Sequence, residues 1–257
     1  MKKYNIEIMN DTQIIIGARG SKLSMAQTKI FSQCAEMHYK NLNKEKVKIV
    51  EIKTAGDLEQ NARLDKLGGK GLFAKEIEIQ IMEDKIDVGL HSMKDLPAEL
   101  DSNFEIGCWL ARSDPHDVLL TKNGTEFKDL KSGAVIGTSS IRRRSQILNI
   151  RNDLTIRALR GNVETRIKKL NEGYYDGIIL SYAGLIRLKL ENLSKFILPL
   201  DQFLPAACQG AIGAEIKKTN TSTKLFLKPL NNLETALCCS TERNVLNYIH
   251  ANCNTPI

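Results

Sequence analysis

The sequence predicts an α/β protein with two lobes, because strand-like and helix-like segments alternate through most of the chain. Composition agrees with a folded protein. The 257 residues are 42% hydrophobic and include only 17 Gly and 6 Pro, which excludes collagen-like and disordered chains. The alternation also repeats, and a strand returns after a loop at 204–210 that contains Pro and Gly. We therefore expect two chain crossings and a hinged cleft between the lobes.

The first lobe is predicted from a strand, helix, strand pattern near the N-terminus. The helix is indicated by apolar residues near helical spacing at Leu23, Ala26, Ile30 and Ala35. The returning strand at 211–215 is expected to rejoin this lobe, so domain 1 is assigned to 1–110 and 211–228. Its expected elements are a strand at 13–18, a helix at 23–39, a strand at 47–53, a helix at 73–82 and a strand at 87–90.

The second lobe repeats the pattern and is assigned to 111–210, although its strands are expected from near Glu105. Largely parallel sheets are expected in both lobes. Residues 219–223 are polar and are interpreted as a linker. Residues 229–257 are expected to be an incomplete third α+β domain containing a helix at 233–248. The expected second-lobe elements are strands at 104–111, 118–121, 134–137, 155–159 and 177–181, helices at 141–150 and 163–171, and a short helix near Leu185.

The charged residues favour an anionic ligand. The formal charge is +7, and eight of the twelve arginines lie between Arg142 and Arg187, which indicates a local anion site. Aromatic residues make up only 5% of the chain, so a stacking platform for nucleic acid is not expected. No apolar run is long enough to span a membrane, and the N-terminus lacks the apolar core of a signal peptide. We expect a cytoplasmic protein that binds neither membrane nor nucleic acid.

The six cysteines show no CxxC or Cys/His spacing typical of a zinc site. In a reducing compartment they are expected to remain thiols, so neither disulfides nor a metal site is predicted. Most are interpreted as small core residues, since free cysteine is among the most buried residue types.

The motif GTSSIRRR at 137–144 indicates an anion site. A strand ends in a glycine and three hydroxyl residues, and a helix with three consecutive arginines begins. Helix N-terminal N–H groups, hydroxyls and guanidiniums together bind carboxylate or phosphate. Arg157, Arg160 and Arg166 surround the next turn, RGNVETR, and such turns gather at the carboxyl ends of strands. The alternative is a solvated basic face.

The motif HSMKDLP at 91–97 follows an apolar strand, and Asp95 is our candidate for the catalytic group. A carboxylate held in a strand-end loop can transfer protons or stabilise a cation. Asp95 could equally cap a helix or pair with Lys94, and His91 is more typical of a packing residue.

Two further turns could contact an acidic ligand. LGGKGLFAKE at 67–76 places Lys70 in a glycine-rich turn, but Leu64 and Gly71 exclude a Walker A loop. One interpretation of this segment is a cationic loop that closes over an anion, and the alternative is a flexible turn without a role. GARGSKLSMAQ at 17–27 offers Arg19 and Ser21.

Taken together, the motifs resemble the porphobilinogen deaminase family, also called hydroxymethylbilane synthase. Each block is weak alone, but they occur in the family's order across nearly the whole chain. The resembling blocks are RGSKLSMAQ (19–27), KTAGD (53–57), GGKGLFAKE (68–76), HSMKDLP (91–97), IGTSSIRR (136–143), LRGNVETR (159–166), AGLIRL (183–188), LPAACQGAIG (204–213) and NCNTPI (252–257).

This resemblance implies a transferase with two periplasmic-binding-protein-like lobes. It would join four porphobilinogen units head to tail, release ammonia from each, and yield hydroxymethylbilane for haem and related tetrapyrroles. The family carries a covalent dipyrromethane primer on a cysteine thioether, and Cys253 matches that cysteine. Asp95 matches the catalytic carboxylate. The positions that match primer and substrate binding are Arg19, Ser21, Lys66, Lys70, Lys94, Ser140, Arg142, Arg143, Arg160, Arg166, Arg187 and Gln209, with Phe73 as an aromatic of the mobile loop.

The implied chemistry needs both positively charged side chains and a carboxylate. Each pyrrole ring carries an acetate and a propionate, so the growing chain requires many cationic neighbours. Loss of ammonia leaves an azafulvenium-like cation, which a fixed carboxylate stabilises before it accepts the released proton. Asp95 suits both tasks. The family resemblance also suggests a monomer. In the family a third domain supports the primer-bearing loop, whereas this sequence ends four residues after Cys253, so a truncated, inactive deaminase is also considered.

Two other function classes fit the composition. A two-lobed clamp could bind an anionic small molecule without chemistry, and such a clamp needs neither Asp95 nor Cys253. A basic nucleic-acid binder would instead show affinity that falls steeply with salt.

Overall fold

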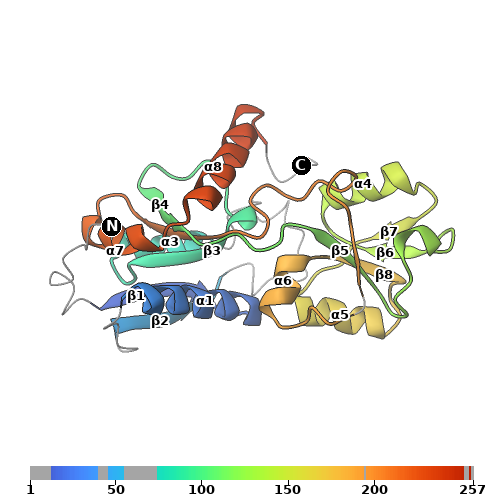
Figure 1. Cartoon of the computed structure of the whole chain (residues 1–257), viewed down its shortest axis with the longest axis horizontal. Helices are drawn as coiled ribbons and strands as arrows, with labels where there is room; N and C mark the ends of the chain where they lie inside the picture. Colours follow the sequence, from blue (N-terminus) through green and yellow to red (C-terminus); the bar gives the residue numbers. More distant parts are fainter. Residues whose placement is uncertain (1–12, 40–45, 55–73, 194, 252–254, 256–257) are drawn as a thin grey trace.

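The computed structural model describes residues 13–39, 46–54, 74–193, 195–251 and 255. Figure 1 shows two lobes side by side along the long axis of the molecule, each built around one sheet. The first sheet has the strand order β2-β1-β3-β10-β4 and the second has the order β7-β6-β8-β5-β9. The predicted α/β class and the two lobes are confirmed.

Each sheet is mixed, so the expectation of largely parallel sheets was wrong. In the first, β1 runs parallel to β2 and β3, whereas β10 is antiparallel to β3 and β4. In the second, β6 is parallel to β7 and β8, whereas β5 is antiparallel to β8 and β9. The antiparallel strands β5 and β10 are those that the chain enters directly from the other lobe. The first-sheet strands are β1 (Ile14–Arg19), β2 (Val47–Ile52), β3 (Val88–Ser92), β4 (Phe104–Trp109) and β10 (Ile212–Lys217). The second-sheet strands are β5 (Asp117–Thr121), β6 (Val135–Gly137), β7 (Thr155–Arg157), β8 (Gly177–Ser181) and β9 (Lys195–Ile197).

Four of the described helices begin at polar residues that cap them. Ser21, Ser140, Asn220 and Asn232 each accept a hydrogen bond from the backbone N–H three residues later, which satisfies a donor that the helix itself leaves free. The α-helices are α1 (Lys22–His38), α3 (Lys75–Met82), α4 (Ile141–Ile150), α5 (Val163–Asn171), α6 (Tyr182–Arg187), α7 (Thr221–Leu227) and α8 (Leu233–Tyr248). Short 3-10 helices are η3 (Met93–Asp95), η4 (Phe127–Asp129) and η5 (Lys228–Leu230).

Two predictions about elements were wrong, and one strand was missed. Residues 219–223 are not a linker, because α7 begins at Thr221 and its Phe226 and Leu227 are fully buried in the first-lobe core. The strand after Glu105 does not open the second lobe, since β4 pairs with β10 in the first sheet. The short strand β9 was missed, because only three residues pair with β5.

The chain passes between the lobes twice, after β4 and before β10, and these two crossing segments lie against each other. The Leu110 N–H donates to Ile212 O at 3.0 Å, and the Ser113 N–H donates to Gly210 O at 3.0 Å. Gly210 has φ +89°, and a Cβ there would meet Ser113 O at 2.2 Å, so this close approach requires glycine. The crossings therefore form one bonded pair of segments at the junction of the lobes.

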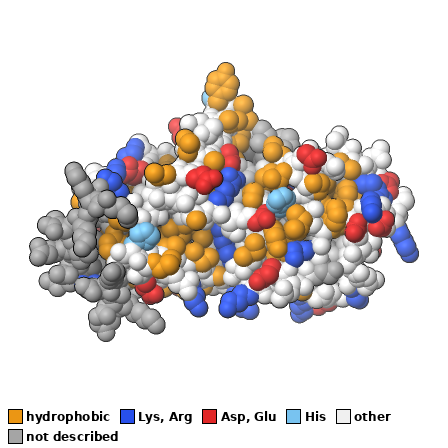
Figure 2. Space-filling model, in the orientation of Figure 1, with side chains coloured by type: hydrophobic (Ala, Val, Ile, Leu, Met, Phe, Trp, Pro, Cys, Tyr) orange, Lys and Arg blue, Asp and Glu red, His pale blue; other side chains and the backbone are white. Residues whose placement is uncertain are grey.

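Helix α8 packs one side on β4 and projects away from the lobes (Figure 1). Its anchor is polar as well as apolar, since Asn232 N–H donates to Trp109 O at 2.7 Å and Arg243 Nη2 donates to Pro97 O at 2.6 Å. Figure 2 shows hydrophobic side chains gathered on the projecting part. Leu233 and Tyr248, at the two ends of α8, are 78% and 86% exposed. Along the described part of the chain, no helix combines the length and apolar character needed to cross a membrane.

Candidate functional site

A pocket lies where β1 and β3 end. These strands are parallel neighbours, with Ile16 beside Val88, so the turns after them meet at one edge of the sheet. Arg19 ends β1 and Ser21 caps α1, while η3 directly after β3 ends at Asp95. The pocket is lined by Arg19, Ser21, Leu23, Ser24, Gln27, Ala74, Leu90, His91, Ser92, Asp95 and Leu96. Three candidate site residues, Arg19, Ser21 and Asp95, therefore share one cavity.

The walls of this pocket are held by short polar contacts. Gln27 Nε2 donates to Ser92 Oγ at 2.6 Å, which ties α1 to the end of β3. The Ser24 N–H donates to Ser21 Oγ at 3.2 Å. Asp95 itself is exposed, so its carboxylate is accessible to a ligand. The sequence placed Asp95 in a strand-end loop, and the structure confirms that placement.

Beside Asp95, Lys94 connects the pocket to the crossing segments. Its Nζ donates to Gln209 Oε1 at 3.2 Å. Burial lowers the pKa of Lys94 to about 8; Arg143 and Arg142 lower it as well, whereas Asp95 and Asp117 oppose the shift. Cations of the second lobe thus act on the first-lobe turn that contains Asp95.

Arg166 brings a further cation to the same region. Its Nε donates to Gly161 O at 2.7 Å, which fixes the side chain over the α5 N-terminus. Burial lowers the pKa of Arg166 to about 10; the neighbouring Arg143 and Arg160 lower it as well, whereas Asp95 raises it. Asp95 of the first lobe therefore interacts electrostatically with Arg166 of the second lobe.

Arg142 and Arg143 are buried and paired with Asp117. Arg142 Nη2 lies 2.8 Å from Asp117 Oδ2, and Arg143 Nη2 lies 2.6 Å from Asp117 Oδ1. Each arginine also donates from Nη1 to a backbone carbonyl, Arg142 to Leu204 O and Arg143 to Ile179 O. The sequence predicts that both arginines bind carboxylates of a ligand. A buried guanidinium needs a counter-charge, and here Asp117 supplies it.

Asp117 is fully buried at the start of β5 and accepts three donors. The third is Gln209 Nε2 at 2.8 Å. Burial alone would raise the pKa of Asp117, but Arg143, Arg142 and the Gln209 hydrogen bond outweigh it and hold the pKa well below its usual range. Sequence reasoning missed Asp117. An acidic residue at the start of the apolar run DVLL was the available signal, because buried acids are rare unless they are paired.

Gln209 joins both crossing segments. In addition to its contacts with Asp117 and Lys94, Gln209 donates from Nε2 to Pro115 O at 2.7 Å, and its backbone carbonyl accepts from Arg112 Nε at 2.9 Å. The next residue, Gly210, accepts from Arg187 Nη2 of α6, and burial lowers the pKa of Arg187 to about 10. Gln209 and Arg187 thus hold the junction of the lobes.

At the α4 N-terminus, Ser140 acts as the predicted cap. Its Oγ accepts from the Arg143 N–H at 3.3 Å, and its own N–H donates to Thr138 Oγ1 at 3.1 Å. The cap fixes the first turn of the helix that contains both buried arginines.

His91 is buried and lines the pocket. Its Nε2 lies 2.9 Å from Oε2 of Glu215, which is fully buried on β10. This agrees with the interpretation of His91 as a packing residue.

Four candidates, Lys66, Lys70, Phe73 and Cys253, lie outside the described residues. The described candidates give a two-lobed α/β protein with one accessible carboxylate among several cations at the junction of its lobes. Such an arrangement suits an acidic ligand that also carries a group needing a carboxylate partner.

Comparisons with known proteins identify the family. The family model described as porphobilinogen deaminase, dipyromethane cofactor binding domain, matches residues 14–225. A porphobilinogen deaminase of Clostridium acetobutylicum is 42% identical over 245 residues, covering 95% of this chain and 82% of that protein. One of Syntrophobacter fumaroxidans is 42% identical over 250 residues, covering 97% and 80%. The chain therefore belongs to the porphobilinogen deaminase family.

Among solved structures, the chain is similar to a TRAP periplasmic solute binding protein from Desulfovibrio salexigens. The two are 12% identical with a TM-score of 0.49, and the match covers 93% of this chain and 79% of that one.

Proposed function

We propose that this protein is a porphobilinogen deaminase, a transferase that joins four porphobilinogen molecules head to tail and releases ammonia from each. The product is hydroxymethylbilane, for tetrapyrrole synthesis. Membership of the family supports the reaction. The observation that carries the assignment of residues is the pocket that Asp95 shares with Arg19 and Ser21, beside Lys94.

A dipyrromethane cofactor fits the charges at this site. The cations Arg142, Arg143 and Arg160 and the carboxylates Asp95 and Asp117 act electrostatically on Lys94 or Arg166. Burial lowers the pKa of Lys94 and of Arg166, and a bound carboxylate would favour the charged form of both side chains. Arg143 Nε is also buried without a hydrogen-bond partner among the described residues. Acetate and propionate arms would add negative charge to this cationic region.

The residues proposed to hold the cofactor come from both lobes. Cys253 is the proposed attachment point, as the family resemblance implies. When bound, the group supplies the pyrrole ring to which incoming substrate is joined. The proposed binding residues are Arg19, Ser21, Lys94, Asp95, Ser140, Arg142, Arg143, Arg160, Arg166, Arg187 and Gln209, with Lys66, Lys70 and Phe73 proposed to contact substrate.

Asp95 is the proposed catalytic residue. Loss of ammonia from porphobilinogen leaves positive charge on the substrate ring, and an exposed carboxylate fixed at a strand end stabilises that charge. Asp95 then accepts the proton that the reaction releases. Lys94 and Arg166 bind carboxylate arms and orient the ring toward Asp95, which favours the reactive geometry.

The first lobe is proposed to be domain 1, made of 1–110 and 211–228. The second lobe is proposed to be domain 2, at 111–210, and a third domain is proposed to begin at 229. The two sheets support the first two assignments. We also propose that the protein works as a monomer in the cytoplasm, without nucleic acid.

The experiment that tests this proposal is intact mass spectrometry of the purified protein, with Ehrlich's reagent as a colour test. We expect a covalent adduct of two pyrrole units, absent from Cys253→Ser. The exposed Cys238→Ser should retain the adduct and controls for cysteine loss. An unmodified mass in the wild-type protein, together with reversible binding of porphobilinogen, would instead identify an anion-binding clamp.

A further inference from the structure

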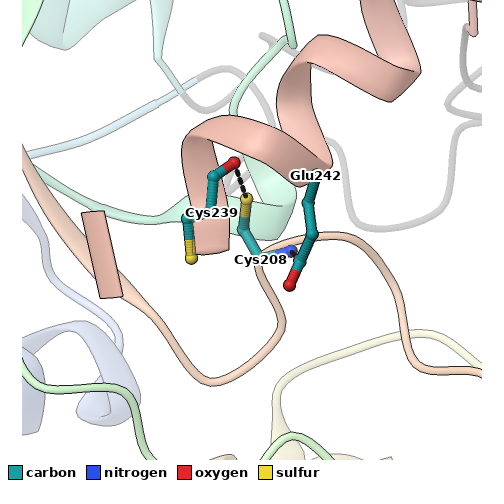
Figure 3. Close-up of side chains that lie close together, drawn as sticks. All are labelled: Cys208, Cys239 and Glu242. Carbon is teal, nitrogen blue, oxygen red and sulfur yellow. Dashed lines mark hydrogen bonds between the residues drawn. The ribbon is translucent and has the colours of Figure 1, made fainter. Parts of the chain in front are cut away.

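The fold brings together two thiols that are far apart in the sequence. Cys208 lies in the turn before β10, and Cys239 lies on α8 with Glu242 (Figure 3). The two sulfurs and a Glu242 carboxylate oxygen all lie within 4.8 Å of one another. Both cysteines are buried beside Met93 and Trp109 in one core cluster. No spacing rule along the chain could reveal this pair.

The backbone at Cys208 favours contact between the two residues. Its φ of +59° is in the left-handed region that glycine prefers and that costs a residue with a side chain about 1 kcal/mol or more. This conformation directs Cys208 Sγ to Cys239 O, at 3.5 Å. In Figure 3 the Cys208 side chain points toward α8. The two sulfurs lie within 4.8 Å of each other, and rotation about the side-chain bonds is the movement that a disulfide requires.

Two arginines and the Glu242 carboxylate surround the pair. Arg112 forms a two-point contact with Glu242, through Nη1 to Oε1 and through Nη2 to Oε2 at 3.1 Å. Arg112 and Arg243 both interact electrostatically with the sulfurs. Interaction with the Cys208 thiol lowers the pKa of Cys239; burial and Glu242 oppose this, and Arg112 and Arg243 add to it. Cys239 is therefore the sulfur of the pair that is more readily present as a thiolate, the nucleophilic form.

A metal ion is a poor occupant of this cluster. Both Glu242 oxygens already contact Arg112, and Oε2 also accepts the Cys208 N–H. A cation bound by the sulfurs would lie beside two guanidiniums, at Arg112 and Arg243. Only the two sulfurs remain as ligands, whereas structural zinc takes four.

We propose that Cys208 and Cys239 are a modification site that forms a reversible disulfide on reaction with hydrogen peroxide. The Cys239 thiolate attacks a peroxide oxygen, the O–O bond breaks, and Cys239 becomes a sulfenic acid with loss of hydroxide. The Cys208 sulfur then attacks the Cys239 sulfur, the S–S bond forms, and the sulfenic oxygen leaves as water after accepting the Cys208 proton. The thiols lose two electrons, the peroxide is reduced, and a dithiol reverses the reaction.

This site does not depend on the proposed function. The disulfide would tie α8 to the turn that contains Gln209, one residue after Cys208. Because both sulfurs are buried, the oxidant must be small, and oxidised glutathione is expected to react instead at the exposed Cys238.

Peptide mapping of the full-length protein tests this inference. Trypsin separates Cys208, in peptide 196–217, from Cys238 and Cys239, in peptide 225–243. After hydrogen peroxide and alkylation, we expect the two peptides to be cross-linked, with a mass lower by two hydrogens, and to separate again with dithiothreitol. The cross-link should persist in Cys238→Ser and disappear in Cys239→Ser and in Cys208→Gly, whose glycine suits the positive φ.

Three results would overturn the inference. The first is complete alkylation of both Cys208 and Cys239 after peroxide treatment and unfolding. The second is a cross-link that is lost in Cys238→Ser and kept in Cys239→Ser. The third is stoichiometric Zn²⁺ uptake by the reduced protein that Cys208→Gly abolishes, which would assign the pair to a metal.

Discussion

The Arg143 guanidinium and the Asp117 carboxylate lie 2.6 Å apart, from Nη2 to Oδ1, in the buried junction of the lobes. The other Asp117 oxygen, Oδ2, accepts a hydrogen bond from Arg142 Nη2. One carboxylate therefore orients two guanidiniums of the cationic site. Removing it would leave two buried positive charges facing each other. Asp117 therefore holds the α4 arginines in place before any ligand binds.

Asp117→Asn is expected to destabilise the protein by about 3–5 kcal/mol, the cost of breaking a buried ion pair by removing one partner. Urea denaturation checks this, with the exposed Asp129→Asn as the control, expected within about 0.5 kcal/mol of the wild type. Equal stability of the two variants would show that Asp117 is not the counter-ion of these arginines. Because the pKa of Asp117 is held well below its usual range, its stabilising effect is complete above about pH 4 and is lost only as the pH falls further.

Lys94 predicts how binding of an acidic ligand depends on pH. Burial lowers its pKa to about 8, so the free protein loses this positive charge as the pH rises through 8. Affinity for porphobilinogen or an acidic analogue should fall across that range. Calorimetric titration between pH 6 and pH 10 measures it. Lys94→Arg should remain charged and abolish the fall, because arginine keeps its proton throughout. An unchanged profile in Lys94→Arg would assign the titration to another group.

Helix α7 gives a matched test of packing, because two adjacent residues differ in burial. Phe226 is fully buried and stacks on Tyr39 with ring centroids 5.0 Å apart, whereas Leu225 is 56% exposed. Phe226→Ala should cost about 3–5 kcal/mol of unfolding free energy, while Leu225→Ala should change it by less than about 1 kcal/mol. Thermal or urea unfolding measures both. Similar losses would contradict the position of α7 in the first-lobe core.

Local sequence patterns predicted most elements and the place of Asp95. Helices 141–150 and 163–171 and strand 177–181 were predicted at their observed bounds, since capping residues and apolar spacing act over a few residues. The prediction of a linker at 219–223 was wrong for two reasons. The polar composition of these residues includes Asn220, which caps α7, and Phe226 is buried by residues of strands that are distant in the sequence.

The site was predicted as a set of residue types, without the contacts between them. The arginines of GTSSIRRR were noted, yet their partner Asp117 lies 25 residues before Arg142, and only the fold brings them together. The same holds for Cys208 and Cys239, which are 31 residues apart. Strand direction was also missed, because β5 and β10 are reached by crossings whose geometry depends on the other lobe.

The central claim is that Asp95, in a pocket shared with Arg19 and beside Lys94 and Arg166, performs the chemistry. The most direct measurement is porphobilinogen consumption by Asp95→Asn, with intact mass recorded before and after substrate. We predict an unchanged primer mass and elongation slower by about 10²–10⁴-fold, while the exposed Glu99→Gln elongates normally. Normal turnover by primer-loaded Asp95→Asn would contradict the account.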